Sequence, residues 1–206
     1  MVLDLDKVPI CLRTDKEYLD WLTGFWEGDG HCCITKSNSV QVSFSQAELE
    51  VLLDIYKSLG IGRLYLQDLF ILYYHGTNAK NLLDTFSPRL VCPSRVTQVN
   101  KLLAALGKSE VVKHKPTDDW IVGFWDAEGS IICGDSSLRL SISQKDGEVL
   151  RCIQSYLGFG RITKSSSGWY VRENSDRENF SELAELLLEK SLNTPKREKL
   201  ELALRI

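Results

Sequence analysis

The sequence contains no long apolar segment and no signal for secretion. None of its apolar runs approaches the roughly 18 residues needed to cross a bilayer. Residues 1–6 lack the basic start and the apolar core of a signal peptide. With 43% apolar and 26% charged residues, the 206-residue chain has the composition of a soluble globular protein. We expect an intracellular protein, in an organelle or a prokaryotic cytoplasm, without a membrane partner.

Cysteine and histidine are present, but not in patterns that indicate a metal centre or a catalytic dyad. The six cysteines form no Cys-x-x-Cys pair, and no histidine lies near them at zinc-ligand spacing. Cys32 and Cys33 are adjacent, so an easy bridge between them is excluded. We therefore expect reduced thiols that pack as small apolar groups. The three histidines are scattered along the chain.

An excess of basic residues, which is usual in nucleic-acid binders, is also missing. The net charge is −3 and the isoelectric point is about 5.7. The charges are nevertheless sorted, because the acidic residues gather on predicted helices. Basic residues fall on predicted strands, namely Arg63, Arg139, Arg161, Lys164 and Arg172. A protein with basic sheets and acidic outer helices can bind DNA despite its net charge.

The chain does contain a nine-residue phrase written twice, as LTGFWEGDG at residues 22–30 and IVGFWDAEG at residues 121–129. Each copy has two acids at positions i and i+2, a Gly-Phe-Trp core and a final glycine. Similar patterns follow both copies, with a Ser-Gln pair ending at Gln46 and Gln144 and a Gly-x-Gly-Arg run ending at Arg63 and Arg161. A repeat at this distance predicts a duplicated domain rather than a solenoid unit.

Each half predicts a helix, two strands, a helix, two strands and two helices. Thr14 and Glu17 have capping-box spacing for the first helix, which ends at Gly30. Alternating residues predict strands at about 31–36, 40–45, 63–67 and 70–75, and, in the second half, a hairpin of 160–165 and 169–173. Ser175 and Glu178 predict a further cap, and Pro195 a helix start. The expected fold is α+β, with pseudosymmetric αββαββα-type subdomains at 1–106 and 118–206 and a linker at 107–117.

Helices are expected to cover the apolar face of each antiparallel sheet and to leave the other face in water. Two such faces side by side would form a long polar groove. The residues of the polar faces are Gln41, Ser43, Arg63, Tyr65, Gln67, Arg139, Ser141, Arg161, Thr163, Tyr170 and Arg172.

Small residues recur on one face of each motif helix, at Gly24 and Gly28 and at Gly123 and Ala127. This spacing lets two helix backbones approach closely. The C-terminal ends of the two helices would then meet and bring together the acids that follow Gly28 and Ala127.

Those acids are Asp29 and Glu128, whose negative charges would repel each other at the negative ends of two helix dipoles. A divalent cation resolves this conflict. Carboxylate and carbonyl oxygens favour Mg²⁺, which keeps several waters and completes its shell with substrate phosphate. The sequence therefore predicts a magnesium site at Asp29 and Glu128.

The two phrases and their trailing patterns resemble the LAGLIDADG homing endonucleases, in the single-chain form with two motifs. The resemblance covers nearly the whole chain. It implies a monomer with an internal pseudo-twofold axis that makes a staggered double-strand break in a long double-stranded DNA target. The residues of the polar sheet faces would then be the DNA-contacting residues, lying over the major groove. Mg²⁺ would be the cofactor, and Mn²⁺ or Ca²⁺ could replace it in binding.

The resemblance also implies roles for individual residues. Asp29 and Glu128 would bind metal with the backbone carbonyls of Gly28 and Ala127, while Glu27 and Asp126 would be structural. The candidate catalytic residues comprise these two metal-binding acids, two glutamines that organise water and the basic residues near the last helix of each half: Asp29, Glu128, Gln46, Gln144, Lys196, Arg197 and Arg95. Arg95 is the only basic candidate in the first half.

Two other readings are compatible with the sequence. The first is a family member that no longer cleaves and acts as an RNA maturase or a DNA-binding protein. The intact motif acids count against it, and the acidic isoelectric point and the missing lysine of the first half leave it open. The second is an unrelated metal-dependent hydrolase with paired carboxylates.

Overall fold

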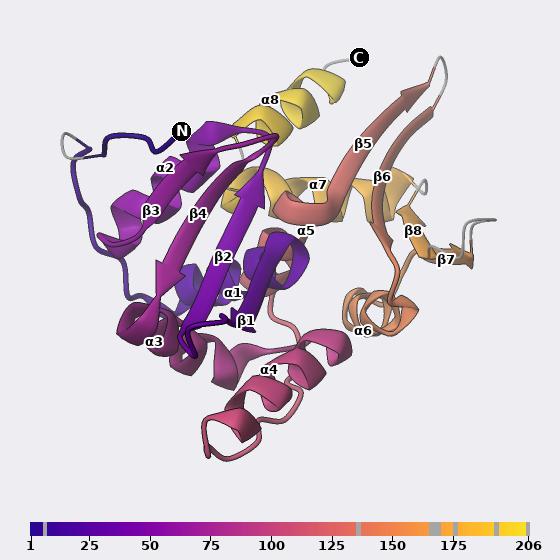
Figure 1. The fold of residues 1–206 in the computed structure, drawn as a ribbon. Helices are drawn as coiled ribbons and strands as arrows, with labels where there is room; N and C mark the ends of the chain where they lie inside the picture. Colours follow the sequence, from indigo (N-terminus) through magenta and orange to yellow (C-terminus); the bar gives the residue numbers. More distant parts are fainter. Residues whose placement is uncertain (6–7, 135–136, 165–169, 175–176, 192–193, 205–206) are drawn as a thin grey trace.

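The computed structural model describes residues 1–206 except 6–7, 135–136, 165–169, 175–176, 192–193 and 205–206 (Figure 1). The side chains of 133–138, 165–179 and 192–194 also lie outside the described part. The predicted hairpin turn at 165–168 and the cap at Ser175 fall on these residues.

The order of elements is the same in both halves and confirms the predicted succession. The first half consists of α1 (Lys16–Asp29), β1 (Gly30–Ile34), β2 (Val40–Gln46), α2 (Leu49–Leu59), β3 (Arg63–Leu66), β4 (Phe70–His75), α3 (Gly76–Phe86), the short 3₁₀ helix η1 (Ser87–Arg89) and α4 (Pro93–Ala105). The second consists of α5 (Asp118–Glu128), β5 (Gly129–Gly134), β6 (Ser137–Gln144), α6 (Gly147–Leu157), β7 (Arg161–Lys164), β8 (Tyr170–Asn174), α7 (Arg177–Lys190) and α8 (Thr194–Ala203). Residues 108–117, between α4 and α5, form neither helix nor strand.

The two antiparallel sheets have equivalent strand orders, β1-β2-β4-β3 and β5-β6-β8-β7. They flank α1 and α5, which lie between them at the centre of the molecule (Figure 1). Helices α2 and α3 pack on the first sheet, and α6 packs on the second. This arrangement confirms the predicted α+β fold with two related halves.

The buried face of each sheet is built from the apolar residues of the alternating pattern. Val42 and Phe44 on β2 and Leu72 on β4 are fully buried in the first half. Leu140 and Ile142 on β6 take the same role in the second half. Burying one such side chain contributes roughly 1.5–3 kcal/mol relative to leaving it exposed.

Helix α1 begins one residue later than the capping pattern predicts. The N-cap is Asp15, whose carboxylate accepts a hydrogen bond from the backbone N–H of Tyr18 at 2.9 Å. Arg13 donates two hydrogen bonds to the same carboxylate, at 3.0 and 3.2 Å, and thereby lowers the pKa of Asp15. The prediction of a Thr14 capping box is therefore wrong, because a charged cap already held by an arginine occupies the position.

Contact between α1 and α5 is the most extensive between any two elements of the described chain. A Cβ atom added to Gly24 would lie 2.1 Å from the carbonyl oxygen of Trp120, and one added to Gly123 would lie 1.9 Å from that of Trp21. Each glycine thus faces a backbone carbonyl of the partner helix. The predicted close approach is confirmed, and only glycine fits at these two positions.

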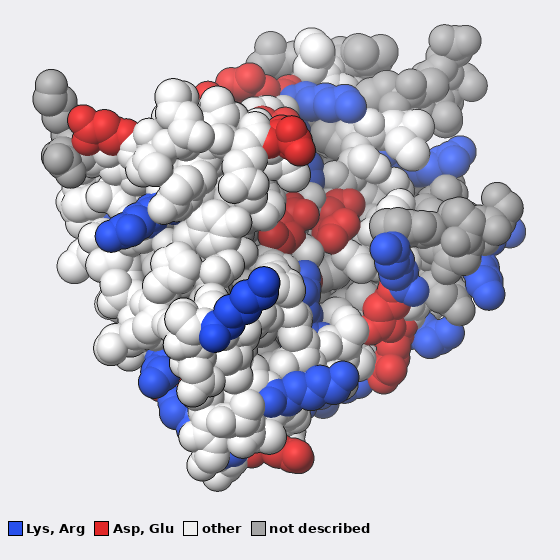
Figure 2. Space-filling model, in the orientation of Figure 1, with Lys and Arg blue, Asp and Glu red and all other residues white. Residues whose placement is uncertain are grey.

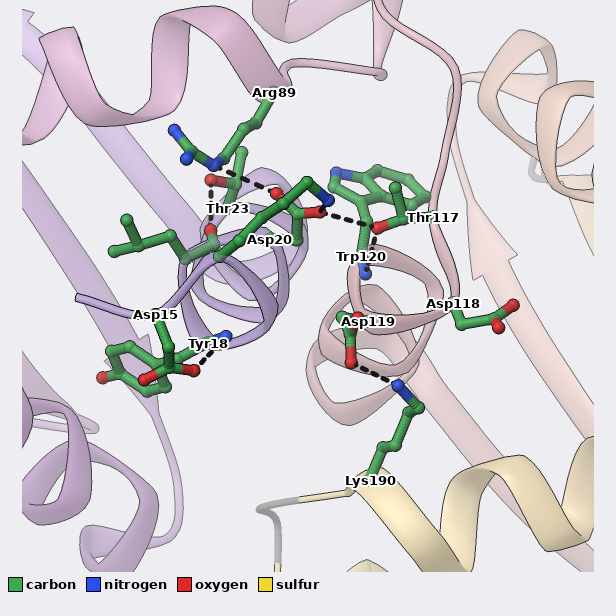
Figure 3. A network of polar contacts seen from close by, with 12 residues as sticks. Asp15, Tyr18, Asp20, Thr23, Arg89, Thr117, Asp118, Asp119, Trp120 and Lys190 are labelled. Atoms are coloured by element: carbon green, nitrogen blue, oxygen red, sulfur yellow. Dashed lines mark hydrogen bonds and ion pairs between the residues drawn. The ribbon is translucent and has the colours of Figure 1, made fainter. Parts of the chain in front are cut away.

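The N-terminal ends of the same helices are held by partly buried polar contacts (Figure 3). Asp20 accepts hydrogen bonds from Arg89 Nε at 3.0 Å and from Thr117 Oγ1 at 3.1 Å. Asp119, the equivalent residue of α5, pairs with Lys190 at 2.8 Å. In each half the acid is therefore paired with a basic residue at or shortly after the end of the third α-helix, α3 or α7.

Five cysteines are described, and all are free thiols. Cys32 and Cys92 are buried, as expected for thiols packed as small apolar groups, and burial raises the pKa of each to about 11. Cys11 instead lies exposed at the surface.

The described helices include none that combines the length and apolar character required to cross a membrane.

Candidate active site

The C-terminal ends of α1 and α5 meet between the two sheets. A Cβ atom added to Gly28 would lie 2.5 Å from Ala127 Cβ and 3.0 Å from Glu128 Cγ. The acids at the ends of the two helices, Asp29 and Glu128, are therefore neighbours. Figure 2 shows acidic side chains near the centre of the face in view, with lysine and arginine distributed around them.

Burial and mutual repulsion make this acid pair unusual. Burial, followed by the charge of Glu128, raises the pKa of Asp29 to about 7. Burial also raises the pKa of Glu128, against a hydrogen bond from Gln144 that lowers it. In the first half the amide of Gln46 donates to the Asp29 carboxylate. Each acid thus has one glutamine partner from the end of the second strand of its own half.

A basic side chain binds the last carbonyl groups of each motif helix. Arg95 on α4 donates to the backbone oxygens of Glu27 at 2.8 Å and of Gly28 at 3.0 Å. Its guanidinium carbon lies 5.6 Å from the centre of the Trp26 ring. The cation therefore faces both the negative end of the α1 dipole and an aromatic ring.

Lys196 on α8 occupies the equivalent place in the second half. Its Nζ donates to the backbone oxygens of Asp126 at 2.6 Å and of Ala127 at 3.1 Å. It lies 5.5 Å from the centre of the Trp125 ring. Burial lowers the pKa of Lys196, while the neighbouring acids oppose that shift.

The structure separates the two basic candidates of α8. Lys196 lies against the end of α5, whereas Arg197 has a side chain 46% exposed and pairs with Glu201 at 3.4 Å. Arg197 is therefore not brought to the acid pair. Helical geometry is the cause, because consecutive residues of a helix point in directions about 100° apart.

The donor set suits a hard divalent cation. Two carboxylates and the carbonyl oxygens of Gly28 and Ala127 lie together, and a carbonyl that accepts one hydrogen bond keeps a second lone pair. Among the described residues, no three His, Cys, Asp or Glu side chains are grouped to form a closed metal cage. Asp29 and Glu128 could thus hold a cation that keeps water and phosphate ligands, which is the usual habit of Mg²⁺.

The earlier acids of the two motifs are fully occupied in structural contacts. Glu27 accepts from the backbone N–H groups of Val91 and Cys92, the latter at 2.8 Å, and from Trp120 Nε1 at 2.6 Å. Burial raises the pKa of Glu27 to about 7.

Asp126 is held in the same manner. It accepts from Trp21 Nε1 at 2.8 Å and from Ser191 Oγ at 2.5 Å. Sequence reasoning overlooked these two tryptophans. The signal was available, because Trp21 and Trp120 each stand immediately before a motif copy.

Comparison with known proteins now bears on this geometry. No protein-family model matches the chain. An intron-encoded DNA endonuclease, ai2b of Dictyostelium discoideum, is 24% identical over 178 residues, which cover 77% of this chain and 66% of that protein. The chain thus spans slightly less than two thirds of that relative.

Solved structures match over nearly the whole chain. The LAGLIDADG meganuclease I-AabMI bound to uncleaved DNA aligns with a TM-score of 0.67 at 16% identity and covers 88% of each chain. This chain has the LAGLIDADG meganuclease fold. The LAGLIDADG endonuclease I-GzeII in complex with its DNA target aligns with a TM-score of 0.63 at 14% identity, over 89% of this chain and 87% of that one. The resemblance predicted from the repeated phrase is confirmed.

In this LAGLIDADG fold the open face of the first sheet carries aromatic residues that the sequence did not single out. Backbone register pairs Ser43 with Tyr73 and Gln41 with His75. Tyr73 lies 5.9 Å from the His75 ring in a stacked arrangement and 5.4 Å from Tyr65 in an edge arrangement. The alternation of β4 was visible in the sequence and could have indicated both residues.

Three predicted DNA contacts of the open faces need correction. Ser43 and Ser141 are only 5% and 3% exposed, because each lies on a central strand between larger neighbours. Ser141 also shares a hydrogen bond of 2.8 Å with Ser130. Gln67 is exposed but lies in the turn after β3, which ends at Leu66.

On the second sheet, Arg161 is exposed, and Arg139 and Thr163 are half-buried. Arg63 is exposed at the start of β3 on the first sheet. These residues keep the positions that the alternating pattern predicts for the open faces.

Tyr170 and Arg172 were also predicted to lie on the open face of the second sheet. They belong to β8, and their side chains lie outside the described part of the structure.

Proposed function

We propose that this chain is a site-specific DNA endonuclease that cuts both strands of a long duplex target with the help of Mg²⁺. The observation that carries the proposal is the pairing of Asp29 with Glu128 at the joined ends of α1 and α5, midway between two open sheets. A binding protein has no need for two buried carboxylates that repel each other.

The relatives support DNA as the substrate. The meganucleases I-AabMI and I-SmaMI are described as bound to uncleaved DNA, and one I-SmaMI complex was obtained in the presence of calcium ions. The relative from Dictyostelium discoideum is named an intron-encoded DNA endonuclease. The two open sheets of this chain would lie along the major groove and contact base edges through residues such as Arg63, Arg139 and Arg161.

The residues of the site divide the work of cleavage. Asp29 and Glu128 would hold Mg²⁺, which when bound polarises a phosphodiester and activates water. Gln46 and Gln144 orient the acids and adjacent water. Arg95 and Lys196 hold positive charge next to the position where the phosphate gains negative charge.

A family member without cleavage activity is the less favoured reading. Both halves retain the motif acid, the glutamine and a basic side chain, and the structure brings all three together in each half. Loss of cleavage would be expected to leave at least one of these sets broken.

The test is cleavage of DNA. A randomised or host-gene-derived duplex library is incubated with the protein in Mg²⁺, and cleaved sites are recovered and sequenced. A single enriched long site that is cut with a short overhang supports the proposal. A protein that binds one site tightly but never cuts it would favour the binding function instead.

A further inference from the structure

Two tryptophans cross the interface between the halves behind the acid pair. Trp21 on α1 donates to Asp126 on α5, and Trp120 on α5 donates to Glu27 on α1. All four residues are at most 3% exposed. We infer that Trp21 and Trp120 are positioning residues. Each holds the basic active-site residue of the opposite half in place: Trp120 acts on Arg95, and Trp21 acts on Lys196. The inference rests on the proposed endonuclease function.

In the first half, the Glu27 carboxylate connects Trp120 with the helix that carries Arg95. Helix α4 has no capping side chain from its own N-terminal residues. Glu27 takes over this task, because it accepts the backbone N–H groups of Val91 and Cys92 just before the helix. Arg95 is the third residue of α4. The carboxylate that Trp120 binds therefore fixes the helical turn that carries Arg95.

Glu27 depends on its donors to remain in place. Its side chain is buried, and a buried polar group is costly unless it is hydrogen-bonded. Its side-chain donors in the described structure come from one indole, that of Trp120, in addition to the two backbone amides. Without the indole N–H, the capping of α4 weakens and Arg95 loses its fixed distance to the end of α1.

The second half repeats this path with different atoms. Trp21 binds Asp126, which also accepts from Ser191 at 2.5 Å. Ser191 directly follows the last residue of α7, and Lys196 is the third residue of α8. Lys196 in turn binds the backbone oxygen of Asp126 at 2.6 Å. Trp21 of the first half is thus connected to Lys196 of the second half through Asp126.

The experiment measures the nicking rate of each DNA strand separately on a target labelled on both strands. Arg95→Ala and Lys196→Ala first assign one strand to each cation. Trp120→Phe should then slow the strand that depends on Arg95 by about tenfold to a hundredfold, the loss expected from displacing a catalytic group by a fraction of an ångström to one ångström. Trp21→Phe should slow the other strand.

Val122→Ala is the matched packing control. Val122 is fully buried on α5, and its side chain has no group that could form a hydrogen bond. A general loosening of the helix interface should affect both strands alike, so this variant shows the pattern of a purely structural role. The opposite strand preferences of Trp120→Phe and Trp21→Phe are not expected from such a role. If one of the two variants does not fold, the other carries the same test.

Equal slowing of both strands by Trp120→Phe and by Trp21→Phe would overturn the inference while leaving the endonuclease function intact. Failure of the unaltered protein to cut any strand would overturn the proposed function and the inference with it. A second readout needs no cleavage. The losses of melting temperature in Trp120→Phe and Glu27→Gln should be less than additive when combined, and additive losses would contradict the contact.

Discussion

The two halves agree closely where they meet and differ where they face solvent. At the interface, each half supplies a glycine against a carbonyl, a tryptophan that binds the partner's acid and a carboxylate at the helix end. On the open sheets the agreement is partial. Both sheets have an exposed arginine at the start of the third strand, Arg63 and Arg161. The first sheet adds the aromatic group Tyr65, Tyr73 and His75, and the described part of the second adds Arg139.

This contrast separates the constraints on the two regions. A Cβ atom at Gly24 or Gly123 would come within about 2 Å of a backbone oxygen of the partner helix, so both copies of the duplicated helix retain glycine there. An open sheet face has no such restriction, so under the proposed function its side chains are free to match a different half of an asymmetric DNA target. The basic active-site residue is an intermediate case. Arg95 and Lys196 bind equivalent backbone carbonyls, but one is a guanidinium and the other an ammonium group.

The largest expected effect is on DNA cleavage. It tests whether Asp29 and Glu128, the acids at equivalent positions of the two halves, act together. The double variant Asp29→Asn with Glu128→Gln should lower double-strand cleavage by roughly a thousandfold or more, because both carboxylates that we propose as metal ligands are lost. DNA affinity should stay roughly unchanged. Gel-shift and cleavage assays on the same duplex separate these quantities. Glu110→Gln, an exposed acid of the linker, is the control, and full cutting by the double variant would remove the assignment.

The next effect is on stability and tests whether the helix contact constrains both halves equally. Gly24→Leu and Gly123→Leu should each lower the free energy of unfolding by more than about 3 kcal/mol, since the side chain would meet a partner backbone. Urea unfolding measures the change. Ala104→Leu, at an exposed position of α4, adds a larger side chain without a clash and should change stability by less than about 0.5 kcal/mol. An unchanged midpoint in either glycine variant would contradict the packing.

How much of this was visible in the sequence follows the same division. The repeat gave the two halves, the element order, the glycine contact and the acid pair, because each depends on local spacing. The crossed bonds of Trp21 and Trp120 were missed, since a partner 105 residues away in the chain is fixed by packing and not by periodicity.

A third prediction concerns the open faces and would sharpen the comparison between the sheets. Arg161→Ala should weaken DNA binding by about 1–3 kcal/mol and, if Arg161 contacts a phosphate, reduce the salt slope by about one. Tyr73→Ala should weaken binding without changing the salt slope, because an aromatic contact releases no counterion. Affinities for target and scrambled duplexes at several salt concentrations measure both. Lys190→Ala, whose partner is Asp119, should leave binding unchanged. If Arg161→Ala and Tyr73→Ala have equal salt slopes and an equal effect on the preference for target over scrambled duplex, the sheets do not differ in this way.

The smallest expected effect is the pH dependence contributed by the acid pair. The pKa of Asp29 is about 7 in the folded protein against an ordinary value of 3.8, so the native state binds more protons than the unfolded chain between these values. Stability contributed by this group is therefore greatest at low pH and declines as the pH rises through about 7. Asp29→Asn removes this dependence and should raise the free energy of unfolding at pH 8 by about 1 kcal/mol, with little change at pH 4. Urea unfolding at both pH values, without divalent cations, measures the difference. The pKa of Glu27 is also about 7, so Asp29→Asn will still show some dependence of the free energy of unfolding on pH. The variant is therefore compared with the unaltered protein at each pH. Adding Mg²⁺ at pH 8 should stabilise the unaltered protein more than Asp29→Asn, because the cation relieves the same repulsion that protonation relieves. An identical pH dependence in both proteins would show that the Asp29 carboxylate is neither buried nor repelled as the structure places it.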